Sequence, residues 1–199
     1  RWLRFSGRAP CEPSAKLVVM IRDWDSLKAA VAGGLQPKYI FFWGHRPLKD
    51  GSIGKSCFSQ WWLSAFEVDG VAYASAEHYM MAEKARLFGD EASRLAILAA
   101  ATPAEAKKLG AQVGGFTEST WVQHRFEIVV RGNQARFTQN PDLADFLRKT
   151  GDRVLVEASP LDRIWGIGLA EDDPRCQDPE QWLGPNLLGF ALMEVRSRL

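Results

Sequence analysis

A hairpin signal runs directly into a helix signal near the middle of the chain, and together they limit the fold class. Residues 66–73 place Asp69-Gly70 between two alternating segments, and an Asp-Gly pair tolerates the positive φ angles of a tight turn. Ser75 then suits the N-cap of a helix that extends to about Phe88, with Gly89 beyond its end. A tight hairpin followed by a capped helix predicts a mixed α+β chain.

Helix signals outnumber strand signals in the rest of the chain. Capping residues, apolar periodicity and terminal glycines predict helices over residues 23–31, 90–100, 102–110, 119–137, 140–150, 178–181 and 188–199. Short apolar runs predict strands over residues 17–21, 39–43 and 154–156. We therefore expect an α+β fold that is predominantly α-helical and has a small β component.

Charge and cysteine usage exclude several classes of protein. The 199 residues carry a formal net charge of +1, which disfavours a polybasic nucleic-acid binder. The three cysteines are odd in number and far apart, which argues against a disulfide framework or a zinc cluster and favours a reducing, cytoplasmic location. The three histidines have no ligand-like spacing, so we expect no metal. No apolar run is long enough for a membrane span.

The helix that follows Ser75 carries charges at both ends of one face. Glu77, Met80, Met81 and Lys84 fall at i, i+3, i+4 and i+7, so Glu77 and Lys84 lie two turns apart, about 10 Å along the axis. Charges at the ends of a buried face suggest a site, because burying an unpaired charge is costly. A purely structural alternative is also open: Glu77 suits the helix dipole, and Lys84 can extend to water.

Two further segments carry candidate ligand residues. A strand over residues 154–156 leads into a loop with Glu157, Asp162 and Trp165, where Gly166 allows close backbone approach. The alternative is that Trp165 is core and Asp162 caps a turn. Asn186 precedes the last helix, either as its N-cap or as an amide that binds a base or sugar. Basic residues of the loop over 44–58, Arg46 among them, suit a phosphate or simply face solvent.

These segments, in this order and spacing, resemble the NADAR superfamily, also called YbiA-like. The matching pieces are Phe41-Phe42-Trp43-Gly44, Cys57-Phe58-Ser59-Gln60-Trp61, residues 66–70, Ser75-Ala76-Glu77-His78-Tyr79 with Lys84, Trp121, Glu157-Ala158-Ser159, Asp162-x-x-Trp165-Gly166, Asn186-Leu187-Leu188-Gly189 and residues 192–196. The resemblance begins at about Tyr39 and predicts a NADAR domain over residues 39–199 after an extension over 1–38. The chain departs from the family at Gln60, often asparagine, and at Ala111, often arginine.

The resemblance implies hydrolysis of an N-glycosidic bond at a ribosyl carbon, without a cofactor. Cleavage of such a bond builds positive charge on the sugar, which a carboxylate from Glu77 or Asp162 would stabilise, or the carboxylate would activate water. Lys84 would act as a Schiff-base nucleophile or as a phosphate or hydroxyl contact. The expected substrate-binding residues are Trp165, Asn186, Trp121, Gly166, Ser59 and Arg46.

Three functions are consistent with the resemblance. The first is cleavage of ribosylated pyrimidine phosphates, the early riboflavin-pathway intermediates, with release of ribose 5-phosphate. The second is removal of ADP-ribose from modified guanine, with single-stranded or modified DNA as the partner. The third is a non-catalytic module that binds NAD or ADP-ribose. Among the eight tryptophans, we expect Trp165 to stack on the base and Trp43 and Trp62 to pack in the core.

Overall fold

The computed structural model describes residues 21–199 as a chain of helices with two small sheets. The helices are α1 (Trp24–Ala32), α2 (Ala76–Leu87), α3 (Glu91–Leu98), α4 (Pro103–Gly110), α5 (Glu118–Gln139), α6 (Pro141–Arg148) and α7 (Leu187–Ser197), with short 3-10 helices η1 (Lys55–Phe58), η2 (Pro174–Gln177) and η3 (Pro179–Gln181). The strands are β1 (Tyr39–Phe42), β2 (Leu63–Val68), β3 (Val71–Ser75) and β4 (Val154–Glu157). The α+β prediction is confirmed; the strand predicted over 17–21 lies outside the described residues as far as residue 20.

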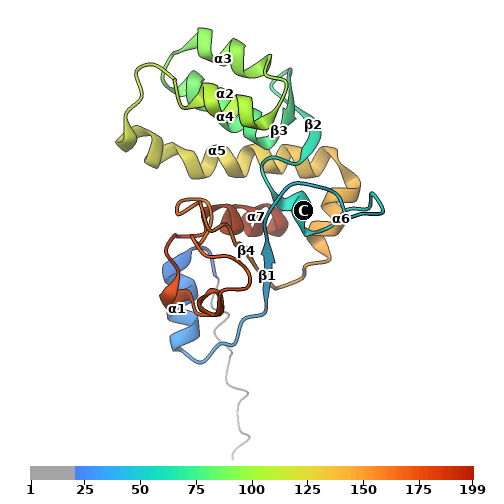
Figure 1. Ribbon diagram of the computed structural model, residues 1–199, viewed down its shortest axis with the longest axis vertical. Coiled ribbons are helices and arrows are strands. Elements are labelled where there is room, and N and C mark those ends of the chain that lie inside the picture. Colours follow the sequence, from blue (N-terminus) through green and yellow to red (C-terminus); the bar gives the residue numbers. More distant parts are fainter. Residues whose placement is uncertain (1–20) are drawn as a thin grey trace, which may run out of the picture.

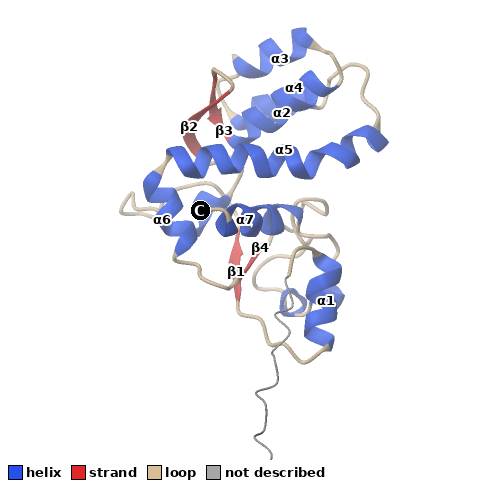
Figure 2. Cartoon of the chain, turned by 180° about the vertical axis from the view of Figure 1, so that it is seen from behind, coloured by secondary structure: helices blue, strands red, loops and turns tan. Residues whose placement is uncertain are grey.

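Helix α5 runs through the middle of the molecule and separates two groups of elements (Figure 1). Helices α2, α3 and α4 and the β2–β3 hairpin pack together on one side of it. Helix α7, the pair β1–β4 and α1 lie on the other side, as the view from behind also shows (Figure 2). Within the described residues no helix is long and apolar enough to cross a membrane.

The predicted hairpin is confirmed, turn included. Strands β2 and β3 pair antiparallel, and the turn between them holds Asp69 at φ 52° and Gly70 at φ 78°. Both positive angles are those of a type I′ turn, which matches the twist of the flanking strands. Helix α2 begins directly after β3, with the Ser75 side chain accepting a hydrogen bond from the His78 N–H.

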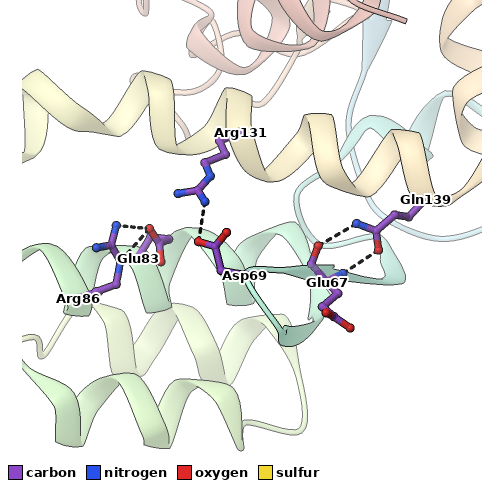
Figure 3. Close-up of polar contacts among 6 residues, drawn as sticks. All are labelled: Glu67, Asp69, Glu83, Arg86, Arg131 and Gln139. Atoms are coloured by element: carbon purple, nitrogen blue, oxygen red, sulfur yellow. Dashed lines mark hydrogen bonds and ion pairs between the residues drawn. The ribbon is translucent and has the colours of Figure 1, made fainter.

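Helix α5 holds the hairpin by polar contacts (Figure 3). The Gln139 side chain forms two hydrogen bonds with the backbone of Glu67, at 2.8 and 2.9 Å, and thereby satisfies polar groups on the open edge of β2. Arg131 forms an ion pair with Asp69 in the turn at 2.6 Å. Exposed ion pairs contribute little stability, so we assign the main orienting effect to the Gln139 contacts.

The sequence predicted strands near β1 and β4 but not that these two strands pair with each other. Strands β1 and β4 are far apart in sequence and pair in parallel, with Phe42 opposite Glu157. Parallel strands end at the same edge of a sheet, so the residues that follow Phe42 and Glu157 emerge together. This edge is the one that faces α2 and the functional cavity described below.

Apolar side chains form two cores. The larger core joins α2, α5, α7 and the hairpin, and the smaller surrounds β1 and β4. Helix α1 belongs to the smaller core through the fully buried Leu27, and the Trp24 indole N–H donates to the Pro179 carbonyl at 2.8 Å. The boundary after residue 38 stays a prediction, although α1, on its N-terminal side, packs against the rest of the fold.

Candidate functional site

A cavity of about 620 Å³ opens where the carboxyl ends of β1 and β4 meet α2. Its other walls come from the loop after η1, from α4, from the first turn of α5 and from the loop over residues 159–165. This volume lies in the range typical of small-molecule sites. The cavity also collects most of the residues that the sequence singled out, from elements that are distant along the chain.

Helix α2 contributes the four residues that its periodicity placed on one face: Glu77, Met80, Met81 and Lys84 all line the cavity. Glu77 is only 3% exposed, and its Oε1 atom is buried with no hydrogen-bond partner in the described part of the chain. Burial raises the pKa of Glu77 to about 7, against the opposing effects of the Lys107 ammonium and a hydrogen bond from Trp61. Glu77 is thus able to exchange a proton near neutral pH.

Lys84 lies at the other end of the same face, against aromatic rings. Its Nζ atom donates to the Gly110 carbonyl at 2.8 Å and lies 4.3 Å from the centre of the Phe116 ring and 5.9 Å from that of Trp121. Burial lowers the pKa of Lys84, although Glu118 opposes this effect. Between residues 21 and 199, no carboxylate forms an ion pair with Lys84, so its charge is available to an anionic ligand.

Glu157, at the end of β4, lines the cavity; the sequence placed it on the same loop as Asp162 and Trp165 but gave it no catalytic or binding role. Its Oε2 atom is buried and has no hydrogen-bond partner in residues 21–199. Burial raises the pKa of Glu157 to about 8, with further contributions from the negative charges of Asp162 and Glu77 and an opposing one from Lys107. The signal that would have given it a role is a carboxylate at the end of a strand whose other residues are all buried.

Asp162 lines the cavity and also holds its own loop. Its Oδ1 atom accepts the backbone N–H groups of Ile164 and Trp165 at 2.8 and 2.7 Å. The Asp162 N–H donates to Ser159 Oγ at 3.2 Å, and Ser159 lines the cavity as well. The turn-capping role is therefore present, and it fixes the backbone that presents Trp165 to the cavity.

Asn186 requires a correction, because its side chain does not line the cavity. It is completely buried at φ 55°, and its Oδ1 accepts the Glu157 N–H at 2.9 Å while its Nδ2 donates to the Leu155 carbonyl at 2.8 Å. The side chain forms no capping hydrogen bond to α7 either. With oxygen and nitrogen both engaged by β4, Asn186 positions that strand.

Gly166 and Arg46 also lie outside the cavity lining. A Cβ atom at Gly166 would lie 2.7 Å from the Glu157 carbonyl oxygen, so glycine is needed there for close packing of two backbone segments. Arg46 is exposed, and its carbonyl accepts a hydrogen bond from Ser56 Oγ at 2.6 Å. His45 of the same loop does line the cavity, with its ring 5.4 Å from the Trp61 ring.

The division of the tryptophans between the apolar core and the cavity differs from the prediction at one residue. Trp62 is 9% exposed and packs in the larger core, as expected. Trp43 is 57% exposed and lines the cavity, so the prediction that it packs in the core is wrong: β1 ends at Phe42, before it. Trp121 and Trp165 both line the cavity, and stacking on a base stays a prediction for them.

A buried polar network that the sequence did not reveal supports the loop with Ser59 and Gln60, which both line the cavity. The fully buried Arg136 donates to the carbonyls of Ser59 and Cys57, at 2.8 and 3.1 Å. Asn133, one turn earlier on α5, donates to the Gln60 Oε1 atom at 2.8 Å. The available signal was polar residues at helical spacing among the apolar residues of α5.

The two departures from the family pattern both lie at the cavity. Gln60 and Ala111 line it from the η1 loop and from the end of α4. The Gln60 side chain is held by Asn133, and its carbonyl accepts the Glu77 N–H at 2.9 Å. Gln60 thus links the two elements that carry Ser59 and Glu77.

Comparison with known proteins gives matches over this same part of the chain. An N-glycosidase, R617, of Acanthamoeba polyphaga mimivirus is 42% identical over 164 residues, which are 80% of this chain and 95% of that protein. The N-glycosidase YbiA of Escherichia coli is 29% identical over 144 residues, 72% of this chain and 79% of the relative. The NMR structure of Escherichia coli YbiA has a TM-score of 0.62 at 26% identity, covering 82% of this chain and 86% of that one.

These relatives share one class of enzyme, the N-glycosidases, which are hydrolases acting on N-glycosyl compounds. The NADAR domain itself matches residues 41–199, which include every residue that lines the cavity. With this match and with relatives more than 30% identical over most of their length, the chain belongs to the NADAR domain family.

Proposed function

We propose that this N-glycosidase cleaves ribosylated pyrimidine phosphates of the kind formed early in the riboflavin pathway, and releases ribose 5-phosphate. The observation that carries the proposal is that Glu77 and Lys84 line one cavity from a single helix face, two turns apart. A buried carboxyl group at one end and a cation at the other fit a substrate whose reacting carbon and phosphate are separated by a ribose.

The carboxyl end of the cavity supports bond cleavage. Glu77, Glu157 and Asp162 lie there; the charge of Asp162 raises the pKa of both glutamates, and the charge of Glu77 raises that of Glu157. A negative charge at this place stabilises the positive charge that builds on the sugar as the base departs, and a basic carboxylate activates water for attack on the same carbon. Trp165 forms an aromatic wall beside these groups and would stack on the base.

The Lys84 end supports binding of the phosphate. The Gly110 carbonyl and the face of Phe116 both favour the charged ammonium, and two of its three donors are not used by Gly110. We assign Lys84 to the phosphate or a sugar hydroxyl; a Schiff base with an opened ribose is the alternative outcome, which chemical trapping detects.

The test is release of ribose 5-phosphate from ribosylated pyrimidine phosphates, measured by mass spectrometry. We expect release by the wild type and a loss of about 1000-fold in the Glu77→Gln variant, because general acid–base groups contribute about 10²- to 10⁴-fold. Glu127→Gln, on the exposed surface of α5, is the matched control and should be fully active. No release by the wild type, or unchanged release by Glu77→Gln, would refute the proposal.

The rim of the cavity supports a second candidate, an ADP-ribosylguanine hydrolase that acts on modified DNA. Trp43, Leu161 and Ile164 line the cavity yet are 57, 88 and 44% exposed. Exposed apolar side chains at the mouth suit bases that flank one inserted nucleotide. The test is loss of ADP-ribose from a modified oligonucleotide, with ribosylated pyrimidine phosphates as the competing substrates.

A further inference from the structure

We propose that Glu157 is a further catalytic residue, which donates its proton to the nitrogen of the departing base while Glu77 accepts a proton from the attacking water. This assignment rests on the proposed N-glycosidase function and adds to it the identity of the group that protonates the leaving base. It uses a residue that sequence reasoning placed on the loop but did not select.

The first argument is that two carboxyl groups share one cavity and each has a free oxygen. Glu77 reaches the cavity from α2 and Glu157 from the end of β4. Glu77 Oε1 and Glu157 Oε2 are both buried, and neither has a hydrogen-bond partner among the residues that the structure describes. A structural carboxylate at a strand end normally accepts hydrogen bonds from its neighbours, so oxygens left free in a cavity point to a ligand.

The second argument is that the fold fixes the backbone of Glu157 on both sides. Its N–H donates to Asn186 Oδ1 at 2.9 Å, and its carbonyl accepts the Ile167 N–H at 3.0 Å. The absence of a side chain at Gly166 lets the neighbouring backbone approach that carbonyl. These contacts come from two separate segments, and together they hold a carboxyl group in one place, as a group that transfers a proton requires.

The third argument distinguishes the acid from the base. The groups that face Glu157 are Asp162 on the loop and Glu77 on α2, both negative, with Lys107 on α4 as the weaker opposing charge. For Glu77, the influences after burial are Lys107 and a hydrogen bond from Trp61, which both lower its pKa, and then the smaller opposing effect of the Asp162 charge. Negative neighbours favour the protonated form and a cation favours the carboxylate, so Glu157 holds its proton more strongly than Glu77.

The step balances without any further reactant. The bond between the ribosyl C1 and the base nitrogen breaks, and its electron pair stays on the nitrogen, which takes the carboxyl proton of Glu157. The oxygen of water bonds to C1, and one of its protons passes to the Glu77 carboxylate. The products are the free sugar and the protonated base, and transfer of the proton from Glu77 back to Glu157 restores the starting state.

The kinetic test compares two leaving groups in the same variants. A ribosylated pyrimidine phosphate needs a proton on its departing nitrogen, whereas nicotinamide departs from nicotinamide riboside phosphate as a neutral base that needs none. We expect Glu157→Gln to lose about 100-fold in kcat on the pyrimidine substrate and less than about 5-fold on the nicotinamide substrate. Glu77→Gln should lose activity on both, and the Glu127→Gln control on neither.

Equal losses by Glu157→Gln on the two substrates, or no loss on the pyrimidine, would overturn the assignment. If the wild type cleaves neither substrate, the proposed substrate class is refuted, and the protonation of Glu157 is then measured directly by infrared spectroscopy. Infrared spectra at pH 7 should contain the band of a protonated carboxyl group that is missing in Glu157→Gln and kept in Glu127→Gln. A spectrum that Glu157→Gln leaves unchanged would also overturn the assignment, whatever the substrate.

Discussion

The cavity has two walls that carry chemical groups, and the chain builds them in different ways. The α2 wall (Glu77, Met80, Met81 and Lys84) is one face of a single helix. The β4 wall (Glu157, Asp162 and Trp165) comes from a strand end and the loop after it, and Asn186 holds the strand end from the start of α7. One helix determines how the α2-wall side chains lie, whereas the β4-wall side chains are positioned by a contact between residues 29 positions apart in the sequence.

This difference predicts two responses to mutation. Replacing Glu77 or Lys84 removes a chemical group and leaves α2 in place, because neither side chain belongs to the apolar core. In the β4 wall, residues outside the cavity decide where the chemical groups lie, so changes there affect stability and activity together. The following predictions test this contrast, from the largest expected effect to the smallest.

Lys84→Met should give the largest effect, a loss of about 1000-fold in kcat/KM, or about 4 kcal/mol of transition-state stabilisation. The unbranched methionine side chain removes the ammonium that lies over the Phe116 ring without adding bulk, so the free energy of unfolding should change by less than about 1 kcal/mol. Steady-state kinetics and urea unfolding measure the two quantities.

Lys84→Arg is the matched control for the role of this lysine. An arginine keeps the charge for a phosphate but forms no Schiff base, so we expect it to recover part of the activity. Borohydride added during turnover should leave Lys84 unmodified by mass spectrometry. A trapped sugar adduct on Lys84, with an inactive Lys84→Arg variant, would replace the phosphate assignment by the Schiff base.

Asn186→Ala should lower the free energy of unfolding by about 3 kcal/mol. The substitution leaves the Glu157 N–H and the Leu155 carbonyl without hydrogen-bond partners in the interior. It also places alanine at φ 55°, a left-handed backbone conformation that asparagine tolerates better. Asn186→Gly removes the same hydrogen bonds without the backbone strain and should recover about 1 kcal/mol. Equal stability of wild type and Asn186→Ala would show that β4 is held by other contacts.

Glu157→Gln should make the protein more stable at alkaline pH. Because the pKa of Glu157 is raised to about 8 in the folded protein, the unfolded chain releases this proton at lower pH than the folded one. Wild-type stability therefore falls as the pH rises from about 4.5 to about 8. The variant lacks this loss and should be more stable than wild type by on the order of 2 kcal/mol at pH 8.5, by urea unfolding, with the difference shrinking toward pH 4.5.

The exposed Glu127→Gln variant should follow the wild type at both pH values. A Glu157→Gln variant whose stability relative to wild type is the same at pH 4.5 and 8.5 would mean that the folded protein does not hold this proton. In the expected outcome, the β4 wall keeps a carboxyl group that lowers stability at neutral pH and above, as residues that serve a site often do.

Sequence reasoning succeeded where the structure is local. The hairpin turn at Asp69-Gly70, the cap at Ser75 and the placement of Glu77 and Lys84 on one face all follow from short-range backbone preferences and helical spacing. The α2 wall could thus be predicted from the sequence, because all of its residues lie on one helix.

The β4 wall was available only in part: the sequence placed Glu157, Asp162 and Trp165 on one loop, but no local pattern shows which other elements lie beside that loop. The parallel pairing of β1 with β4 joins residues more than 100 positions apart, and it decides that Trp43 and Glu157 emerge at the same edge. Without that pairing, Asn186 looked like a cap or a ligand amide, although its side chain holds Glu157. The family motifs marked these residues as one group but did not separate those that line the cavity from those behind it.

The smallest effect should come from Trp165→Phe, which tests whether the β4 wall contacts the substrate directly. The Trp165 backbone is fixed by Asp162 Oδ1 and by the Leu188 N–H, and phenylalanine keeps both contacts, so the unfolding free energy should fall by less than about 1 kcal/mol. The smaller ring offers less stacking area, so KM should rise about 10-fold. Trp62→Phe is the matched control, because Trp62 packs in the core away from the cavity; it should lower stability and leave KM unchanged. The opposite ordering of the two variants would make Trp165 a core residue and leave the β4 wall with its carboxyl groups alone.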